Sequence, residues 1–162
     1  MNRTDYLNAV AEFFYQGEVL GEAFFATYVA LEQDPVRRYK WGTLMQLETE
    51  TKALLRPFMV RLGLGVAQAD MTARITPYAE GYNTKSWHQH MEEIADITGF
   101  FLEKFRAIEA AAPEDEVATA RYMVEHETAL HRFARLEMMG DSTGSLADVV
   151  GQLRWPLPVV AA

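Results

Sequence analysis

The chain has 162 residues, about the size of one ordinary domain. Hydrophobic residues make up 49% of it and charged residues 23%, a balance that excludes disordered and low-complexity classes. A formal net charge of -8 repels phosphate backbones and anionic bilayers, so we expect no nucleic-acid partner and no membrane partner. No apolar run has the length of a membrane span or a signal-peptide core, so we expect a cytoplasmic protein.

Cysteine is absent from the sequence. This excludes disulfides, zinc ribbons, iron-sulfur clusters and thiol nucleophiles. Any metal ion must therefore be held by Glu, Asp and His side chains.

Two long helices are predicted in the first part of the chain, because apolar residues recur there at spacings of three and four. Thr4 is the expected cap of the first, which covers about residues 4–33. Asp34 followed by Pro35 is typical of a helix start, and the second helix covers about 35–62. The short break between them predicts an antiparallel hairpin.

The periodicity is lost over residues 64–84, apart from a short helix predicted near 67–75. Two further helices are predicted at about 85–111 and 113–139, and they form a second hairpin. A long connection between the two hairpins makes residues 1–162 one all-α domain, a four-helix bundle.

A short fifth helix capped by Ser145 is predicted to cover 145–153, before the apolar tail from Trp155 to Val160. We expect this tail to make a homodimer contact, because it is more apolar than a free terminus usually is.

Polar residues on the inner faces of the predicted helices indicate a site, because each residue turns a helix by 100°. Glu18 lies inward on the first helix, and Glu48 and Thr51 on the second. His126 lies inward on the fourth, with Glu125 on its flank. The third helix offers only His90 and Thr98. The remaining polar residues nearby are predicted to face solvent: Glu50, Lys52, Glu127 and His131.

Three of these residues are also predicted to share one height. Glu18 and Glu48 each lie about 15 residues from the first turn, and His126 lies about 14 residues from the second, so all three fall near mid-helix at 1.5 Å per residue. Buried carboxylates cost several kcal/mol unless they are neutralised, paired or coordinated. Coordination to a divalent metal would offset this free-energy cost, and a Glu/Glu/His ligand set suits iron, manganese or zinc.

The layout resembles the ferritin-like superfamily of carboxylate metal bundles over roughly residues 4–140. In that family the first and third helices each contribute a Glu, and the second and fourth each contribute Glu-x-x-His. Glu18 stands at the first-helix position, Glu48 at the second-helix Glu and His126 at the fourth-helix His. The other ligand positions differ: Thr51 replaces a His, Met123 replaces a Glu, and Thr98 or Ile94 stands where the third helix has an acid.

The resemblance implies an iron- or manganese-dependent oxidase or oxygenase that acts on a small molecule. Its metal ligands would be Glu18, Glu48 and His126, and Tyr122 or Tyr28 would assist in electron or proton transfer. A helical heme-oxygenase-like fold is an alternative, in which His90 or His126 would bind iron or heme.

Three further interpretations need no metal. Glu18 or Glu48, its pKa raised by burial, could act with His126 as general acid and base on a small apolar substrate. The interior of the bundle could instead be a ligand pocket without catalysis. The chain could also be a structural bundle whose tail docks on a partner subunit.

Overall fold

The computed structural model describes residues 1–159, and its secondary structure is helical, as the periodicity predicts. No strand occurs within these residues. The elements in chain order are α1 (Arg3–Ala9), η1 (Val10–Tyr15), α2 (Gln16–Leu31), α3 (Pro35–Arg61), α4 (Thr72–Gly81), η2 (Tyr82–Thr84), α5 (Trp87–Ala111), α6 (Val117–Met138) and α7 (Ala147–Gln152).

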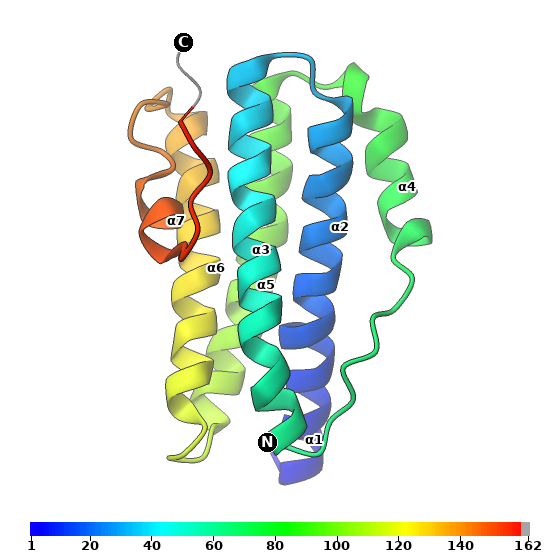
Figure 1. Ribbon diagram of the computed structural model, residues 1–162, viewed down its shortest axis with the longest axis vertical. Helices are drawn as coiled ribbons and strands as arrows, with labels where there is room; N and C mark the ends of the chain where they lie inside the picture. Colours follow the sequence, from blue (N-terminus) through cyan, green and yellow to red (C-terminus); the bar gives the residue numbers. More distant parts are fainter. Residues whose placement is uncertain (160–162) are drawn as a thin grey trace.

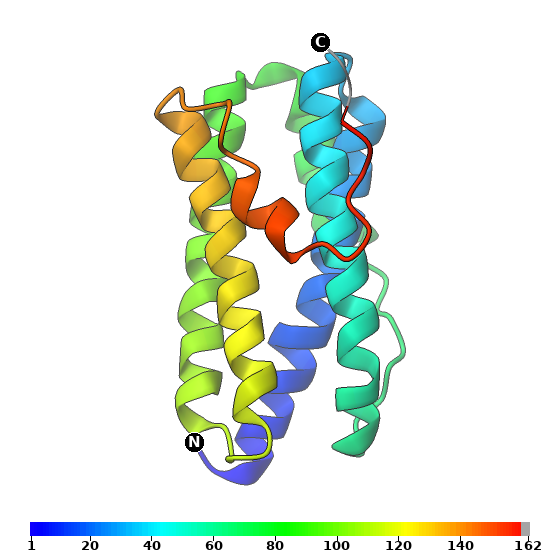
Figure 2. The same cartoon turned by 60° about the vertical axis from the view of Figure 1, so that its left-hand side comes forward.

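The long helices α2, α3, α5 and α6 lie side by side along the length of the molecule (Figures 1 and 2). The most extensive contacts are those between α5 and α6 and between α2 and α3. Each of these pairs is antiparallel. The connection over 62–86 returns along the outside of α2, with α4 beside it, so α3 and α5 run in the same direction (Figure 1).

The first predicted helix contains a feature that the sequence pattern did not reveal. Residues Val10–Tyr15 form a π-helical turn between α1 and α2. In this turn Tyr15 is buried, and its hydroxyl donates to the carbonyl of Val66, 2.9 Å away in the long connection. Asn2 caps α1 by accepting from the backbone N–H of Asp5, so the cap expected at Thr4 is wrong.

The short helix of the connection lies further along the chain than expected. It covers Thr72–Gly81 instead of 67–75, because the Asp70 carboxylate accepts from the backbone N–H of Thr72 and fixes the start there. The preceding extended segment is held by Gln16, whose side chain bonds the backbone of Ala67 and Ala69.

The later helices also begin after their predicted starts. α6 begins at Val117 instead of 113, because residues 114–116 form a turn in which Glu116 pairs with Arg3 at 2.7 Å. α7 covers only Ala147–Gln152. Ser145 does not cap it, since the Ser145 hydroxyl donates to Glu137 instead.

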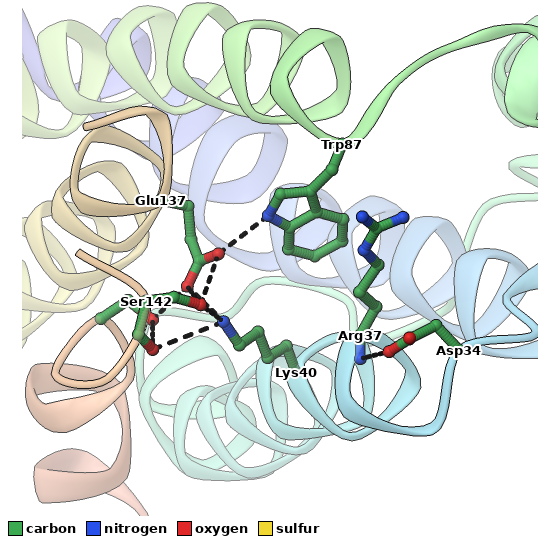
Figure 3. Close-up of polar contacts among 7 residues, drawn as sticks. Asp34, Arg37, Lys40, Trp87, Glu137 and Ser142 are labelled. Atoms are coloured by element: carbon green, nitrogen blue, oxygen red, sulfur yellow. Dashed lines mark hydrogen bonds and ion pairs between the residues drawn. The ribbon is translucent and has the colours of Figure 1, made fainter. Parts of the chain in front are cut away.

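Glu137 anchors the end of α6 through a buried polar network (Figure 3). Its carboxylate pairs with Lys40 of α3 and accepts from the indole N–H of Trp87 of α5 at 2.8 Å. The hydroxyls of Ser142 and Ser145 complete its hydrogen bonds. This network ties three long helices to the segment that precedes α7.

The apolar core consists of two clusters, one toward each end of the long helices. One contains Phe25, Trp41, Leu44, Ile94 and Phe133, among others. The other contains Phe14, Leu55, Met59, Phe105 and Met123. On α3, α5 and α6, a mid-helix segment separates the residues of one cluster from those of the other, and it carries the polar residues described below. On α2, Glu18 lies next to Val19 of the second cluster.

The segment after α7 runs back over α3 (Figure 2). Its backbone N–H groups at Arg154 and Trp155 donate to Glu50 at 2.6 and 3.0 Å. Trp155 is 62% exposed. Val160, the last residue of the predicted apolar tail, lies outside the described residues, and the homodimer stays a prediction. Within residues 1–159, no helix combines the length and apolarity needed to cross a bilayer.

Candidate metal centre

A polar layer occupies the space between the two apolar clusters. Glu18 of α2, Glu48 and Thr51 of α3 and His126 of α6 are all buried there. On each helix these residues share the inward face with the core residues one turn before and after them. The mid-helix layer predicted from the distances to the two turns is therefore present.

Three of these side chains converge closely enough to share one ion. One ligand atom from each of Glu18, Glu48 and His126 lies within 4.8 Å of the other two. Nε2 of His126 is 3.4 Å from Oε1 of Glu18 and 3.8 Å from Oε2 of Glu48. Ligand atoms about 2.0–2.2 Å from an ion lie roughly 3–3.6 Å apart, so small side-chain adjustments bring all three to bonding distance.

Gly21 of α2 provides the space that the Glu48 carboxylate occupies. A Cβ atom at this position would lie 2.5 Å from the carboxyl carbon of Glu48, far inside van der Waals contact. The missing side chain at Gly21 thus lets Glu48 lie against the backbone of α2, beside Glu18 one turn away.

Burial controls the protonation of all three groups. Desolvation, followed by the nearby charge of Glu48, holds the pKa of Glu18 well above its usual value. Desolvation likewise raises the pKa of Glu48 to about 8. It lowers the pKa of His126 to about 3, so the imidazole is neutral at pH 7. A neutral His and deprotonated carboxylates are the forms that bind a metal, and metal binding must therefore displace carboxyl protons.

Thr51 orients the imidazole of His126. Its hydroxyl oxygen lies 3.1 Å from Nδ1 of the ring and 3.3 Å from the Tyr122 hydroxyl. When Nδ1–H donates to Thr51, the lone pair of Nε2 points at the two carboxyl groups. Hydrogen bonds of this kind fix the tautomer of metal-binding histidines. Tyr122 thus reaches the centre through Thr51 and does not contact the carboxyl groups.

Two polar atoms at the centre have no partner within the described chain. Oε2 of Glu18 and Nε2 of His126 are both buried without a hydrogen bond. A buried polar group left in this way costs roughly 1–3 kcal/mol, and more when it is charged. Nε2 of His126 lies 3.4 Å from Oε1 of the same Glu18 carboxyl group and 3.8 Å from Oε2 of Glu48, with no hydrogen bond of its own, so the donor set fits a metal.

Lys52 lies closer to the centre than the helix pattern predicts. It is buried instead of facing solvent, and it pairs with Glu22 of α2. Because Glu22 engages this ammonium group, Lys52 makes no direct contact with the carboxylates of Glu18 or Glu48. Its long apolar stem allows this burial, which its angle from the apolar stripe of the helix did not predict.

Glu127 and His131 were also expected to face solvent, and this expectation is wrong for both. Glu127 is buried, and desolvation together with the charge of Glu48 raises its pKa well above the usual value. His131 is half-buried, and its Nδ1 lies 3.0 Å from the Thr98 hydroxyl. The buried face of α6 is therefore wider than its apolar stripe.

The remaining candidates lie away from the centre. His90 is buried near the start of α5, where its ring stacks on Tyr82 and its Nε2 lies 3.2 Å from the Tyr82 carbonyl oxygen. Tyr28 donates to Glu93 at 3.0 Å, and Glu125 is exposed. Met123, at the position of a family Glu, is buried in an apolar cluster. Within residues 1–159, the Glu18/Glu48/His126 trio is the one group with metal-ligand spacing.

Comparisons with known proteins do not assign the chain to a family: no family model, no curated protein and no solved structure matches it. The function must therefore be argued from the geometry of the site.

Proposed function

We propose that the chain is a ferritin-like four-helix bundle that holds one iron or manganese ion at Glu18, Glu48 and His126, and that it acts as an oxidoreductase on a small molecule. The fold assignment is supported by the two antiparallel hairpins and by the single long connection that makes α3 and α5 parallel. The convergence of three buried ligand atoms within 4.8 Å carries the metal proposal.

The ligand types favour a single redox-active divalent metal. Two carboxylates and one imidazole suit iron and manganese, and they leave coordination positions open for substrate or water. An ion with two positive charges would neutralise the two carboxylates, for which the described residues provide no directly contacting cation. No acid of α5 reaches the centre, because Thr98 stands at mid-helix and bonds the Ile94 carbonyl. This supports one ion instead of two.

Each residue then has a defined part. Glu18 and Glu48 provide negative charge, and His126 provides a neutral nitrogen held by Thr51. The ion would supply Lewis-acid and one-electron chemistry. The hydroxyl group of Thr51 connects His126 to the hydroxyl group of Tyr122, which is half-buried, and a proton can move along this chain. The two apolar clusters above and below exclude water from the centre.

Metal analysis of protein purified without chelator tests this proposal. We expect close to one iron or manganese per chain, and a higher melting temperature on addition of Fe(II) or Mn(II). An ion at 100 times its dissociation constant stabilises the folded state by about 2.7 kcal/mol. Glu48→Ala should abolish both effects. Glu12→Ala is the control: Glu12 is exposed and is not one of the three proposed ligands, so this change should alter neither the metal content nor the melting temperature. Sub-stoichiometric metal, together with no stabilisation by added ions, would refute the proposal.

A metal-free acid–base enzyme is the second candidate, and one observation favours it. At pH 7 the Glu48 carboxyl, with a pKa of about 8, still carries a proton, while His126, with a pKa of about 3, is a neutral acceptor beside it. This pair could transfer a proton to and from an apolar substrate. Activity that survives exhaustive chelation and is lost in Glu48→Gln would favour this candidate over the metal-dependent one.

A further inference from the structure

A cavity of about 730 Å³ lies beside the metal centre. It is bounded by α2, α4, α5 and α6 and by Glu48 of α3, and Glu18 and Glu48 form part of its wall. The volume falls within the range of about 300–1,000 Å³ that is typical of small-molecule sites. The proposed metal centre is therefore accessible from a chamber large enough for an organic molecule.

Hydrocarbon surrounds most of this chamber. Aromatic rings line it from three helices, with Phe24 and Phe25 on α2, Tyr78 on α4, and Phe100, Phe101 and Phe105 on α5. Phe100 lines the cavity and is 51% exposed, so an apolar surface extends from the cavity wall to solvent. Gly17 adds no side chain to the wall, and Phe101 lies 3.4 Å from the position of its missing Cβ. Flat apolar molecules are favoured by such a lining.

The polar groups of the chamber select against negative charge. Glu18, Glu48 and Glu127 are its three buried acids, and the lining contains one basic residue, the exposed Arg74 of α4. In the metal-free protein, a carboxylate or phosphate placed at the inner end would lose its hydration and meet no cation among the buried lining residues. Glu18 lines the chamber, and its Oε2 has no hydrogen-bond partner within the described residues, which favours a ligand with a hydrogen-bond donor at this end.

We propose that this chamber is the substrate site and that it takes an uncharged, largely aromatic molecule whose inner end lies against Glu18 and Glu48. Its role as the substrate site rests on the proposed metal-dependent function. Binding of the aromatic molecule itself depends only on the apolar walls and can be measured without metal.

α4 forms one wall of the chamber. Ala73, Arg74, Pro77 and Tyr78 of this helix line the chamber, and α4 rests mainly on α2. A second hollow of about 450 Å³ lies on the other side of α4, lined by Glu22, Met71 and Ile75 among others. α4 therefore lies between the two hollows and contributes residues to the wall of each.

A pair of ligands with nearly the same shape and different charge tests the inference. 2-Naphthamide and 2-naphthoate have nearly the same shape, but only the second is an anion at pH 7. Calorimetric titration of metal-free protein should show one 2-naphthamide bound per chain and at least ten-fold weaker binding of 2-naphthoate. Equal affinities, or no binding of 2-naphthamide, would overturn the inference.

Cavity-filling variants locate the binding site. Gly17→Leu places a side chain into the chamber from α2, and Ala73→Trp fills it from α4. Each should weaken 2-naphthamide binding at least ten-fold, and retained helical circular dichroism and a cooperative melt should show that the variant is folded. Glu80→Trp, at an exposed position of α4 outside the chamber, is the matched control and should bind as the wild type does. Unchanged affinity in both folded filling variants would overturn the inference.

Cobalt(II) separates this inference from the metal proposal. Its visible absorption reports binding at the Glu/Glu/His centre, and we expect 2-naphthamide to alter that spectrum, because the chamber adjoins the centre. Cobalt binding without any 2-naphthamide binding would overturn the chamber assignment and leave the proposed function intact. 2-Naphthamide binding by a protein that takes up no metal would overturn the proposed function and the role of the chamber as its substrate site.

Discussion

The backbone of α2 at Gly21 lies so close to the Glu48 carboxyl group that a Cβ atom there would be 2.5 Å from its carbon and 2.5 and 2.7 Å from its oxygens. The carboxylate therefore fills the space that any other residue at position 21 would occupy. A glycine on one helix thus determines where a ligand from the neighbouring helix can lie.

Gly21→Ala should weaken metal binding at least ten-fold while leaving all three ligands in the chain. Replacing glycine by alanine within a helix adds up to about 1 kcal/mol of helix propensity, so a loss of metal cannot be attributed to a weaker helix. Gly17→Ala, one turn earlier, is the matched control, because its Cβ would make ordinary contact with Phe101 at 3.4 Å. Titration with Mn(II) followed by calorimetry measures both. Equal affinities in the two variants would contradict the role of Gly21.

Thr51→Val should lower metal affinity by about 10–100-fold, the usual effect of removing a hydrogen bond that orients a metal-binding histidine. The change keeps the shape of the side chain and removes the hydroxyl 3.1 Å from Nδ1 of His126. Thr43→Val is the control, since Thr43 is also buried on α3 but donates to the carbonyl of Tyr39. If both variants bind Mn(II) equally well, Thr51 does not orient His126.

Metal-free protein should lose stability as the pH rises from about 4.5 to about 8. Because the pKa of Glu48 is raised to about 8 in the folded state, its contribution is fully present below the unfolded pKa of about 4.3 and is lost as the pH rises through 8. Glu48→Gln removes this ionisation, so at pH 8.5 the metal-free variant should be more stable than the wild type, although it should bind metal poorly. Urea unfolding at pH 5 and pH 8.5 provides the comparison, with Glu12→Gln as an exposed control. Equal pH dependence in wild type and Glu48→Gln would show that Glu48 is not a protonated buried group.

Lys40→Met should destabilise the protein by about 3–5 kcal/mol, because it leaves the Glu137 carboxylate buried without its cation. Burial alone would raise the pKa of Glu137, but the hydrogen bonds from Lys40, Ser145 and Trp87 outweigh it and hold the pKa below its usual value. The stability that this network contributes should therefore be present above about pH 4.5 and be lost as the pH falls below it.

The surface pair of Arg132 and Asp148 is the control for this prediction. Its atoms are 2.8 Å apart, but both side chains are largely exposed, so Arg132→Ala should cost less than about 1 kcal/mol. Thermal and urea unfolding measure both changes. If Lys40→Met lowers the free energy of unfolding no more than Arg132→Ala does, the buried network does not stabilise the end of α6.

The positions of Glu18, Glu48 and His126 could be predicted because two independent properties of a helix agree on them, its rotation per residue and its rise per residue. The 100° rotation per residue gives the inward face, and the distance from each hairpin turn gives the height. Both depend only on regular helices and short turns, and α2, α3 and α6 are regular where these residues lie. The cap at Asp34 followed by Pro35 was predictable for a similarly local reason, and its carboxylate accepts from the backbone N–H of Arg37.

The features that sequence reasoning missed depend on contacts between distant segments. The π-helical turn coincides with the bond from Tyr15 to Val66, which are far apart in the chain. Glu127 and Lys52 were predicted to face solvent because the helix rotation turns them away from the apolar stripe, whereas both are buried. The space at Gly21 depends on how closely α2 and α3 approach. No single-helix pattern contains this information.

The most direct test of the central claim is anomalous diffraction from crystals grown with Mn(II), with data collected on both sides of the manganese absorption edge. We predict one strong anomalous peak per chain, bonded to Oε1 of Glu18, Oε2 of Glu48 and Nε2 of His126 at about 2.0–2.2 Å. No peak among these three side chains at saturating Mn(II), or a peak only at surface carboxylates, would contradict the metal centre.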